Sequence, residues 1–194
     1  MGTIKIGSAK NKVGITVNPS TVLFNGNNVK KIMSGENVIW EDTVALIPVM
    51  TSNTTPSGVA SASGEAYGDY KAYLAFNGTN SAVEDCWAVV ATTNQWLQYK
   101  FPTAKTVTKI VMTNRNCDDP SLIGSPKSFK LQGSNDGTTW TDIQSFTNTN
   151  NDSNATTEYN VTNTKSYLYY RLYVNNIIGS YTLTTIGKLQ YYGH

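Results

Sequence analysis

The chain has 194 residues, of which 39% are hydrophobic and only 14% are charged, and its formal net charge is +2. This length is enough for one domain with a small additional segment, and it is too short for two large domains with separate cores. No run of Lys and Arg is dense enough to follow a phosphate backbone, so we do not expect nucleic acid as a partner.

The composition favours strands over helices. Asn, Thr and Ser supply much of the polar surface and 11% of the residues are aromatic, which suits β-strands and surfaces that stack on sugars. No stretch approaches about 18 consecutive apolar residues, so we expect no membrane insertion. Met1–Lys5 lacks the apolar region of a signal peptide, and we therefore expect synthesis in a host cytoplasm without a secretion signal.

The first 43 residues differ in character from the rest and form the first predicted domain. Alternating apolar and polar residues predict a strand over Val13–Val17. Three further short strands, separated by turn residues, are expected over Val22–Phe24, Val29–Ile32 and Val38–Trp40. So few residues cannot form a large core. We expect them to self-associate or to dock on another protein, or else to be a β extension of the main domain without a partner of its own.

Residues 44–194 form the second predicted domain and are dominated by strand patterns. Strands are expected over Val44–Val49, Gln95–Phe101, Val107–Met112, Tyr167–Val174 and Lys188–Tyr192. In the second of these, Trp96, Gln98 and Lys100 should lie on one face and the alternate residues on the other.

A hairpin is predicted around residue 136. Apolar and polar residues alternate over Ser128–Gln132, and Ser134–Gly137 supplies residues that tolerate a positive φ. On the returning strand, Trp140 and Ile143 offer apolar bulk. We therefore expect one face of the hairpin to lie in a core.

The run Phe129-Lys-Leu-Gln-Gly-Ser-Asn-Asp-Gly-Thr-Thr-Trp140 resembles the signature of discoidin (coagulation factor 5/8 type C) domains, the fold of family 32 carbohydrate-binding modules. Tyr73–Gly78, Gln95–Phe101 and Tyr170–Leu172 match further segments of that family, and the resemblance covers nearly all of the chain after residue 43. It implies an all-β, antiparallel, jelly-roll-like sandwich with its loops gathered at two ends. It also implies a non-catalytic module that binds a cell-surface or cell-wall saccharide.

The segment Val22–Trp40 resembles the short β segments that open tail and baseplate proteins of bacteriophages infecting Gram-positive hosts. This resemblance implies a place in the virion, other tail or baseplate proteins as partners, and a homo-oligomer. Two alternatives stay open. The chain could be a structural tail assembly protein without sugar binding, or a binding module of a larger glycoside hydrolase.

The resembled modules hold a sugar in a shallow site at one end of the sandwich. The matching positions in this chain are Glu65, Tyr67, Tyr70, Arg115, Asn116 and Tyr181, and Trp87 is expected to join them as a platform. An aromatic ring can cover the apolar face of a sugar, and a guanidinium or amide can donate to several hydroxyls.

Structural roles for the same residues stay open. Trp87 could belong to the core, and the tyrosines could simply anchor loops. Arg115 could pair with Asp118 or Asp119 and fasten its own loop.

No enzyme chemistry is predicted. The single histidine, His194, is the last residue, and Gly58–Gly64 lacks the spacing of a nucleophile elbow. The acidic pairs Glu84-Asp85 and Asp118-Asp119 are adjacent in sequence, and nothing sets the separation across a cleft that a glycosidase needs.

Cys86 and Cys117 are the only cysteines. Two cysteines without an internal histidine cannot make a tetrahedral zinc site. The family resemblance places their loops near the same end of the sandwich, so both a disulfide and a pair of free thiols stay open.

Discoidin-like carbohydrate modules commonly hold a structural calcium with an aspartate in the turn matched by Tyr73–Gly78 and a glutamate in the last strand. Asn77 and Lys188 stand at these positions here. Calcium needs six to eight oxygen ligands, and an ammonium would repel it. We therefore expect no metal. Lys188 should donate to carbonyls around Asn77 in place of the ion, or else point to solvent.

Overall fold

The computed structural model describes residues 2–6, 13–18, 21–24, 27–29, 31–34, 37–41 and 43–194. The chain divides into two compact units, Met1–Val44 with His194, and Ala45–Gly193. In these described residues, no helix has the length and the apolar character needed to cross a membrane.

The first unit consists of short antiparallel strands. One sheet has the order β1 (Gly2–Ile6), β2 (Val13–Asn18), β3 (Thr21–Phe24), β4 (Asn27–Val29), and a separate pair is formed by β5 (Lys31–Ser34) and β6 (Asn37–Glu41). The strand expected over Val29–Ile32 is wrong, because Val29 ends β4 and Lys31 begins β5 in another sheet. The sequence pattern also missed β1, whose pairing with β2 supplies its hydrogen bonds.

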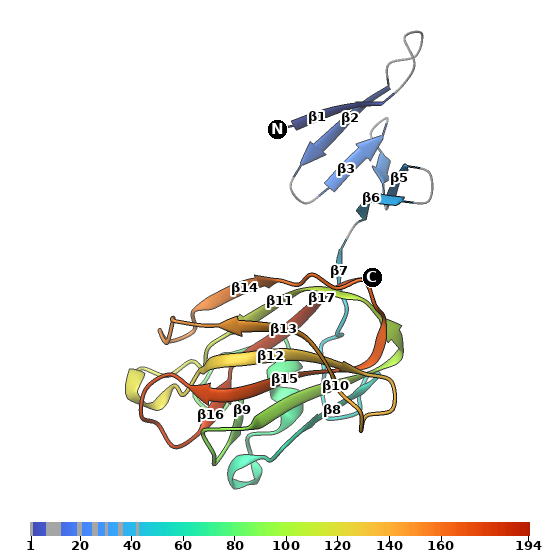
Figure 1. Ribbon diagram of the computed structural model, residues 1–194. Coiled ribbons are helices and arrows are strands. Elements are labelled where there is room, and N and C mark those ends of the chain that lie inside the picture. The colour runs from blue at the N-terminus through green and yellow to red at the C-terminus, as the bar shows by residue number, and fades with distance from the viewer. Residues whose placement is uncertain are drawn as a thin grey trace. The chain divides into compact units, whose positions relative to one another are not determined.

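The second unit is a β-sandwich. The five strands of one sheet follow the order β13 (Thr141–Thr147), β12 (Pro126–Ser134), β15 (Tyr167–Ile177), β10 (Gln95–Lys105), β8 (Val59–Ala62). The facing sheet has the order β14 (Thr156–Asn160), β11 (Val107–Thr113), β17 (Lys188–Gly193), β7 (Val44–Ala45). Figure 1 shows the two sheets as separate layers. The predicted all-β, antiparallel sandwich is therefore confirmed.

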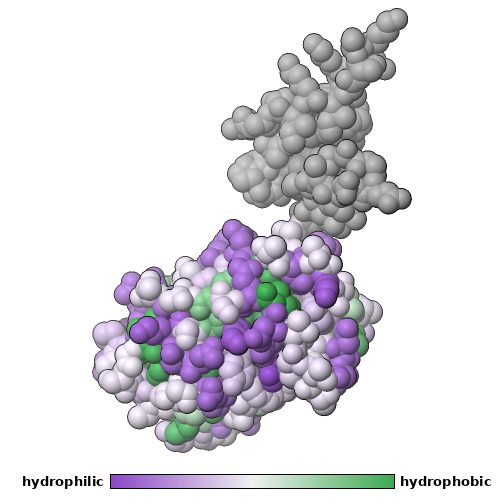
Figure 2. Space-filling view, viewed as in Figure 1, coloured by the Kyte–Doolittle hydropathy of each residue, from purple (hydrophilic) through white to green (hydrophobic). Residues whose placement is uncertain are grey.

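Further short elements lie between the strands of the two sheets in the sequence. They are the strand pair β9 (Trp87–Val89) and β16 (Thr184–Ile186), and the 3₁₀ turns η1 (Ala66–Gly68), η2 (Ala72–Phe76) and η3 (Pro120–Leu122). The side of the second unit that faces the viewer in Figure 2 is mostly hydrophilic or of intermediate hydropathy, with small hydrophobic patches between. Most of the apolar side chains lie between the two sheets.

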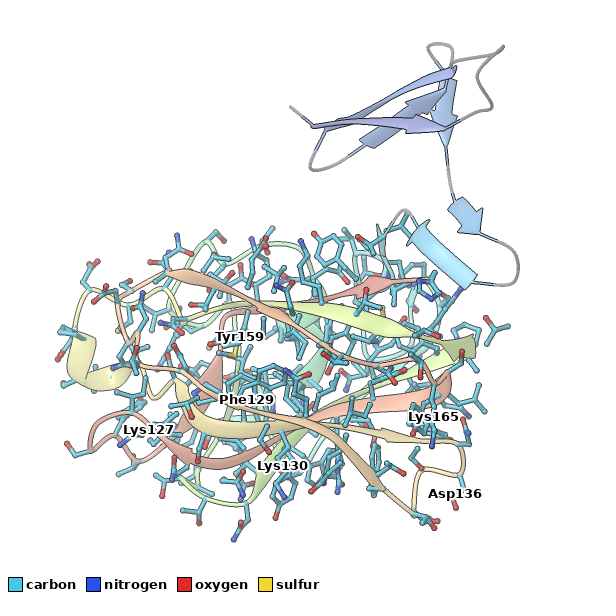
Figure 3. The ribbon with its side chains drawn as sticks, turned by 45° about the horizontal axis from the view of Figure 1, so that its top comes forward. Lys127, Phe129, Lys130, Asp136, Tyr159 and Lys165 are labelled. Carbon is cyan, nitrogen blue, oxygen red and sulfur yellow. The ribbon has the colours of Figure 1, made fainter. Side chains whose placement is uncertain are left out.

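Strand alternation fills the core. In β10, Leu97, Tyr99 and Phe101 are buried, whereas Trp96 and Lys100 lie on the outer face, as predicted. Fully burying a large apolar side chain contributes roughly 1.5–3 kcal/mol. In Figure 3, Phe129 and Tyr159 lie between the sheets with ring centroids 5.2 Å apart, and Lys130 points away from that layer.

The strand expected over Val44–Val49 is much shorter in the structure, because only Val44–Ala45 pairs as a strand. Pro48 has no N–H to donate to a ladder. At Ile47, the residue before Pro48, the Gln190 side chain takes the place of a paired backbone. The Ile47 N–H donates to Gln190 Oε1 at 3.1 Å, and Gln190 Nε2 donates to the Ile47 carbonyl at 2.9 Å.

The turn between β12 and β13 has the predicted chemistry. Gly137 has a φ of +76°, and Asp136 Oδ1 accepts the N–H groups of Thr138 and Thr139, both at 2.7 Å. These hydrogen bonds hold the pKa of the Asp136 carboxyl well below its usual value.

The returning strand differs from the prediction at its start. Leu131 pairs with Gln144 and Gln132 pairs with Asp142, so Ile143 is an extra residue in the ladder. Such a bulge shifts the alternation of inward and outward side chains. Ile143 packs against the core, but Trp140 lies near the Arg171 guanidinium, 4.0 Å from carbon to ring centroid. The expectation that Trp140 contributes to the core is therefore wrong.

Candidate functional site

The Arg115 side chain joins three loops at one end of the sandwich. This residue follows β11, and its side chain is almost completely buried, with an exposed fraction of 3%. Its Nε donates to the Val83 carbonyl at 2.8 Å and its Nη1 to the Leu122 carbonyl at 3.1 Å. Nη1 also donates to Tyr181 Oη at 3.3 Å, and Nη2 donates to Tyr70 Oη at 3.0 Å.

This bonding changes the role expected for Arg115. Most of its donors are used within the protein, so the expected multi-donor contact with a ligand is wrong. Arg115 does fasten loops, but through carbonyls and hydroxyls rather than through Asp118 or Asp119. It is a positioning residue that fixes the hydroxyls of Tyr70 and Tyr181.

The tyrosines of these loops form an aromatic surface. Tyr67 is 74% exposed and has a φ of +52°, and its ring meets the Tyr70 ring edge to face, with centroids 6.4 Å apart. Tyr70 and Tyr181 are half-buried and pack against a small apolar cluster that includes Leu183. Burial raises the pKa of Tyr70, although the Arg115 charge opposes this shift. Its hydroxyl is therefore protonated at neutral pH.

A cleft of about 580 Å³ adjoins Tyr181. It lies between residues 91–93, after β9, and residues 176–182, before β16. Sequence analysis had singled out only Tyr181 among the lining residues. Gly179, whose φ is +79°, marks a turn that could have drawn attention to this loop.

Two of the predicted ligand contacts have structural roles. Trp87 is fully buried and its indole N–H donates to the Gly64 carbonyl at 2.9 Å, so the expected platform role is wrong. Glu65 accepts the Ala72 N–H at 2.9 Å and pairs with Lys71 Nζ at 3.1 Å. Burial raises the pKa of Glu65, but these interactions outweigh burial and leave it below its usual value. Glu65 therefore fastens its own loop.

Asn116 lies beside a second, smaller cleft of about 190 Å³. Its Nδ2 donates to the Asn80 carbonyl at 3.0 Å. Val83 also lines this cleft, and its carbonyl accepts from Arg115. Arg115 thus connects residues of both clefts through Val83 and Tyr181.

The loops at this end carry exposed acidic side chains. Asp69, Glu84, Asp118 and Asp119 are all exposed, and Glu84 is close enough to contribute to the raised pKa of Tyr70. Like charges repel, so this end of the sandwich is poorly suited to a negatively charged ligand.

Cys86 and Cys117 are both buried and both free. The structure therefore has thiols rather than the disulfide that the sequence left open. Burial raises the pKa of Cys86 to about 12, so this thiol is protonated at neutral pH.

The residues at the expected calcium position do not fit the ion. Asn77 Nδ2 donates to Asp85 Oδ1 at 2.6 Å, and Asn77 Oδ1 accepts the Thr79 N–H at 2.8 Å. Asp85 Oδ2 accepts the N–H and the hydroxyl of Ser81 at 2.8 and 3.1 Å. The oxygens that calcium would need are already bound to donors. Within the described parts of the chain, no three His, Cys, Asp or Glu side chains come close enough to hold a metal.

Lys188 does not take the role expected for it. The structure gives no hydrogen bond or ion pair between its ammonium and the loop around Asn77. The side chain is half-buried and lines a separate cleft of about 280 Å³ with Val49 and Tyr192. The expectation that Lys188 donates to carbonyls in place of an ion is therefore wrong.

The fold is similar to those of solved carbohydrate-binding modules. The family 32 module of NanJ from Clostridium perfringens, solved with galactose, has a TM-score of 0.59 and 18% sequence identity, with 77% of this chain and 98% of that chain covered. Chitosan-binding module 1 of a chitosanase/glucanase from Paenibacillus sp. IK-5 has a TM-score of 0.56 and 22% sequence identity, with 73% of this chain and 96% of that chain covered. The family 32 module of AlyQ, in complex with 4,5-unsaturated mannuronic acid, has a TM-score of 0.54 and 20% sequence identity, with 69% of this chain and 92% of that chain covered.

Family membership rests on the sequence. No curated protein matches the chain. The F5/8 type C domain family matches residues 59–186, which is more than half of the chain and includes both the hairpin of β12 and β13 and the loops around Arg115. The chain therefore belongs to the F5/8 type C domain family.

Proposed function

We propose that this protein is a non-catalytic carbohydrate-binding module whose ligand lies on Tyr67, Tyr70 and Tyr181 and in the cleft beside Tyr181. The observation that carries the proposal is the buried Arg115 guanidinium, which holds two tyrosine hydroxyls from different loops. The saccharides bound by the structurally similar modules support the same class of ligand.

The hydrogen-bond directions give the tyrosines a defined role. Each of the two hydroxyl oxygens accepts from Arg115, so each hydroxyl proton is left to donate to a sugar oxygen. The exposed Tyr67 ring offers an apolar face for the sugar ring. A site of this kind combines one stacking surface with a few fixed polar groups, as ligand sites usually do.

We further propose that the module acts in adhesion on a bacteriophage tail or baseplate, with residues 1–43 as the attachment part. The support for this setting is the resemblance of Val22–Trp40 to phage tail segments. Many copies on one particle would turn a weak site into firm adhesion. The alternative of a module in a larger glycoside hydrolase has support of its own, since a similar module comes from a chitosanase/glucanase.

A glycan array tests the binding site. Removing the stacking surface in Tyr67→Ala should cost about 1.5 kcal/mol or more, roughly tenfold in Kd. Tyr181→Ala should weaken binding in a similar way. The matched control is Tyr192→Ala, because Tyr192 is a half-buried tyrosine on β17, away from these loops. Unchanged glycan binding in both loop variants would contradict the site.

A further inference from the structure

The outer face of the five-stranded sheet carries an aromatic and cationic surface made of strand residues rather than of residues in the Arg115 loops. Three neighbouring pairs of β10 and β15 form it: Trp96 opposite Tyr173, Gln98 opposite Arg171, and Lys100 opposite Tyr169. Trp140, which the bulge in β13 leaves outside the core, packs beside them, with its ring centroid 6.5 Å from that of Tyr169. We call this surface the aromatic sheet face; it consists of Trp96, Lys100, Trp140, Tyr169, Arg171 and Tyr173.

Arg171 occupies the centre of the aromatic sheet face. Its guanidinium carbon lies 4.0 Å from the Trp140 ring centroid, 5.3 Å from that of Tyr173 and 5.8 Å from that of Trp96. Its Nε donates to Gln132 Oε1 at 2.6 Å. No hydrogen bond or ion pair of residues 43–194 involves its two Nη atoms, which carry four N–H donors.

The positive charges of this surface outnumber its negative ones. Lys100 is exposed, with its ammonium 5.3 Å from the Tyr169 ring centroid. Lys130, on the neighbouring strand β12, is paired with Asp142 at 2.7 Å. Neither Lys100 nor Arg171 forms a salt bridge within residues 43–194, but Asp142 is close enough for its charge to interact with the Arg171 guanidinium. The single negative charge of Asp142 is outnumbered by the three positive charges of Lys100, Lys130 and Arg171. The surface is therefore complementary to a negative charge.

We propose that the aromatic sheet face binds a glycan that contains uronic acid, at a second site that is independent of the tyrosine loops. A guanidinium presents paired N–H donors that match the two oxygens of a carboxylate. The Trp and Tyr rings around it can cover the apolar faces of the sugars. Lys100 adds a second cation for a neighbouring uronate unit.

The charge distribution separates the two sites. The loops around Arg115 carry exposed acids such as Glu84 and Asp118, whereas the aromatic sheet face carries the cations Lys100 and Arg171, which form no salt bridge within residues 43–194. A uronate glycan should therefore bind to the sheet face. If Arg171 only stabilised the fold, its contacts with the aromatic rings and its Nε hydrogen bond would be sufficient. That role would need neither the Nη donors of Arg171 nor Lys100.

Calorimetric titration of the full chain with oligogalacturonate tests this site. Binding should weaken as salt rises, because the attraction is between charges near the surface. Arg171→Lys keeps the charge but loses the paired donors, and its affinity should fall about tenfold or more. Lys100→Gln should weaken binding severalfold. Lys109→Gln is the matched control, because Lys109 also lies over a tyrosine ring, 4.6 Å from Tyr192, but on the other sheet.

Each outcome decides the proposal. If Arg171→Lys fails to fold, the exposed Lys100→Gln variant still gives the answer. The proposal is overturned if oligogalacturonate does not bind, if Lys100→Gln binds as well as Lys109→Gln, or if a neutral galacto-oligosaccharide binds equally well. Equal binding of single-stranded DNA would show a general affinity for polyanions instead and would also overturn it. Tyr67→Ala should leave uronate binding unchanged, which distinguishes this site from the one in the tyrosine loops.

Discussion

Arg115 and Tyr70 are joined in two ways. Nη2 of Arg115 donates to Tyr70 Oη at 3.0 Å, and the guanidinium carbon lies 5.3 Å from the centroid of the same tyrosine ring. The cation thereby fixes both the hydroxyl and the plane of a residue that comes from a different loop. The aromatic surface at this end depends on a group that is itself almost inaccessible to a ligand.

Replacing Arg115 should reduce stability as well as binding. In Arg115→Ala, the carbonyls of Val83 and Leu122 lose their charged donor, and a hydrogen bond to a charged group contributes roughly 1.5–3 kcal/mol. We expect a loss on the order of 3 kcal/mol in the free energy of unfolding, measured by urea denaturation. The free energy of unfolding of Arg115→Lys should lie between those of the original protein and of the alanine variant. An alanine variant as stable as the original protein would contradict the positioning role.

Asp85 should make stability depend on acid pH. Burial raises its pKa, but hydrogen bonds from Ser81 and Asn77 outweigh burial and leave the folded-state pKa below its usual value. Its contribution is therefore present above the ordinary aspartate pKa of about 3.9 and is lost as pH falls through the lower folded-state value. Melting temperatures of the original protein and Asp85→Asn should differ at pH 7 and converge in acid. A constant difference down to pH 2 would oppose this assignment.

Residues 1–43 should mediate assembly rather than recognition. A chain that begins at residue 44 keeps β7, which pairs with β17 in the sandwich. We expect it to stay folded and to bind glycan, and to lose self-association as measured by light scattering. Aggregation or unfolding of the shortened chain would show instead that the first strands complete the main fold.

Calcium should not stabilise the protein. The oxygens of Asn77 and Asp85 already accept hydrogen bonds, and Lys188 replaces an acidic ligand of the family. Thermal melts with added calcium and with a chelator should therefore coincide. A rise of several degrees with calcium would show that the loop rearranges to bind the ion.

Cys86 should be unreactive while the protein is folded. Burial raises its pKa to about 12, and the thiolate is the reactive form. In a Cys117→Ser background, a thiol reagent at pH 8 should label Cys86 only after denaturant is added. Rapid labelling without denaturant would show that the end of the sandwich opens readily.

The local pattern of the sequence was enough to predict most strands of the sandwich and the turn at Asp136. Alternation in Gln95–Phe101 and the turn residues of Ser134–Gly137 act between near neighbours in the chain, so they can be read without the fold. The same holds for the hairpin motif that identified the family. Val44–Val49 was misjudged because its apolar composition concealed the effect of Pro48.

The tertiary structure alone decided what the individual side chains do. Arg115 was predicted in a loop at one end of the sandwich, but most of its partners are distant in sequence, and only folding shows that they use up most of its donors. Trp87 is buried and Trp140 lies outside the core because sheet packing and one bulge determine which face of a strand meets the core. Burial and hydrogen-bond partners are properties of the whole fold, and for this reason residue type and spacing located the loops but did not assign their roles.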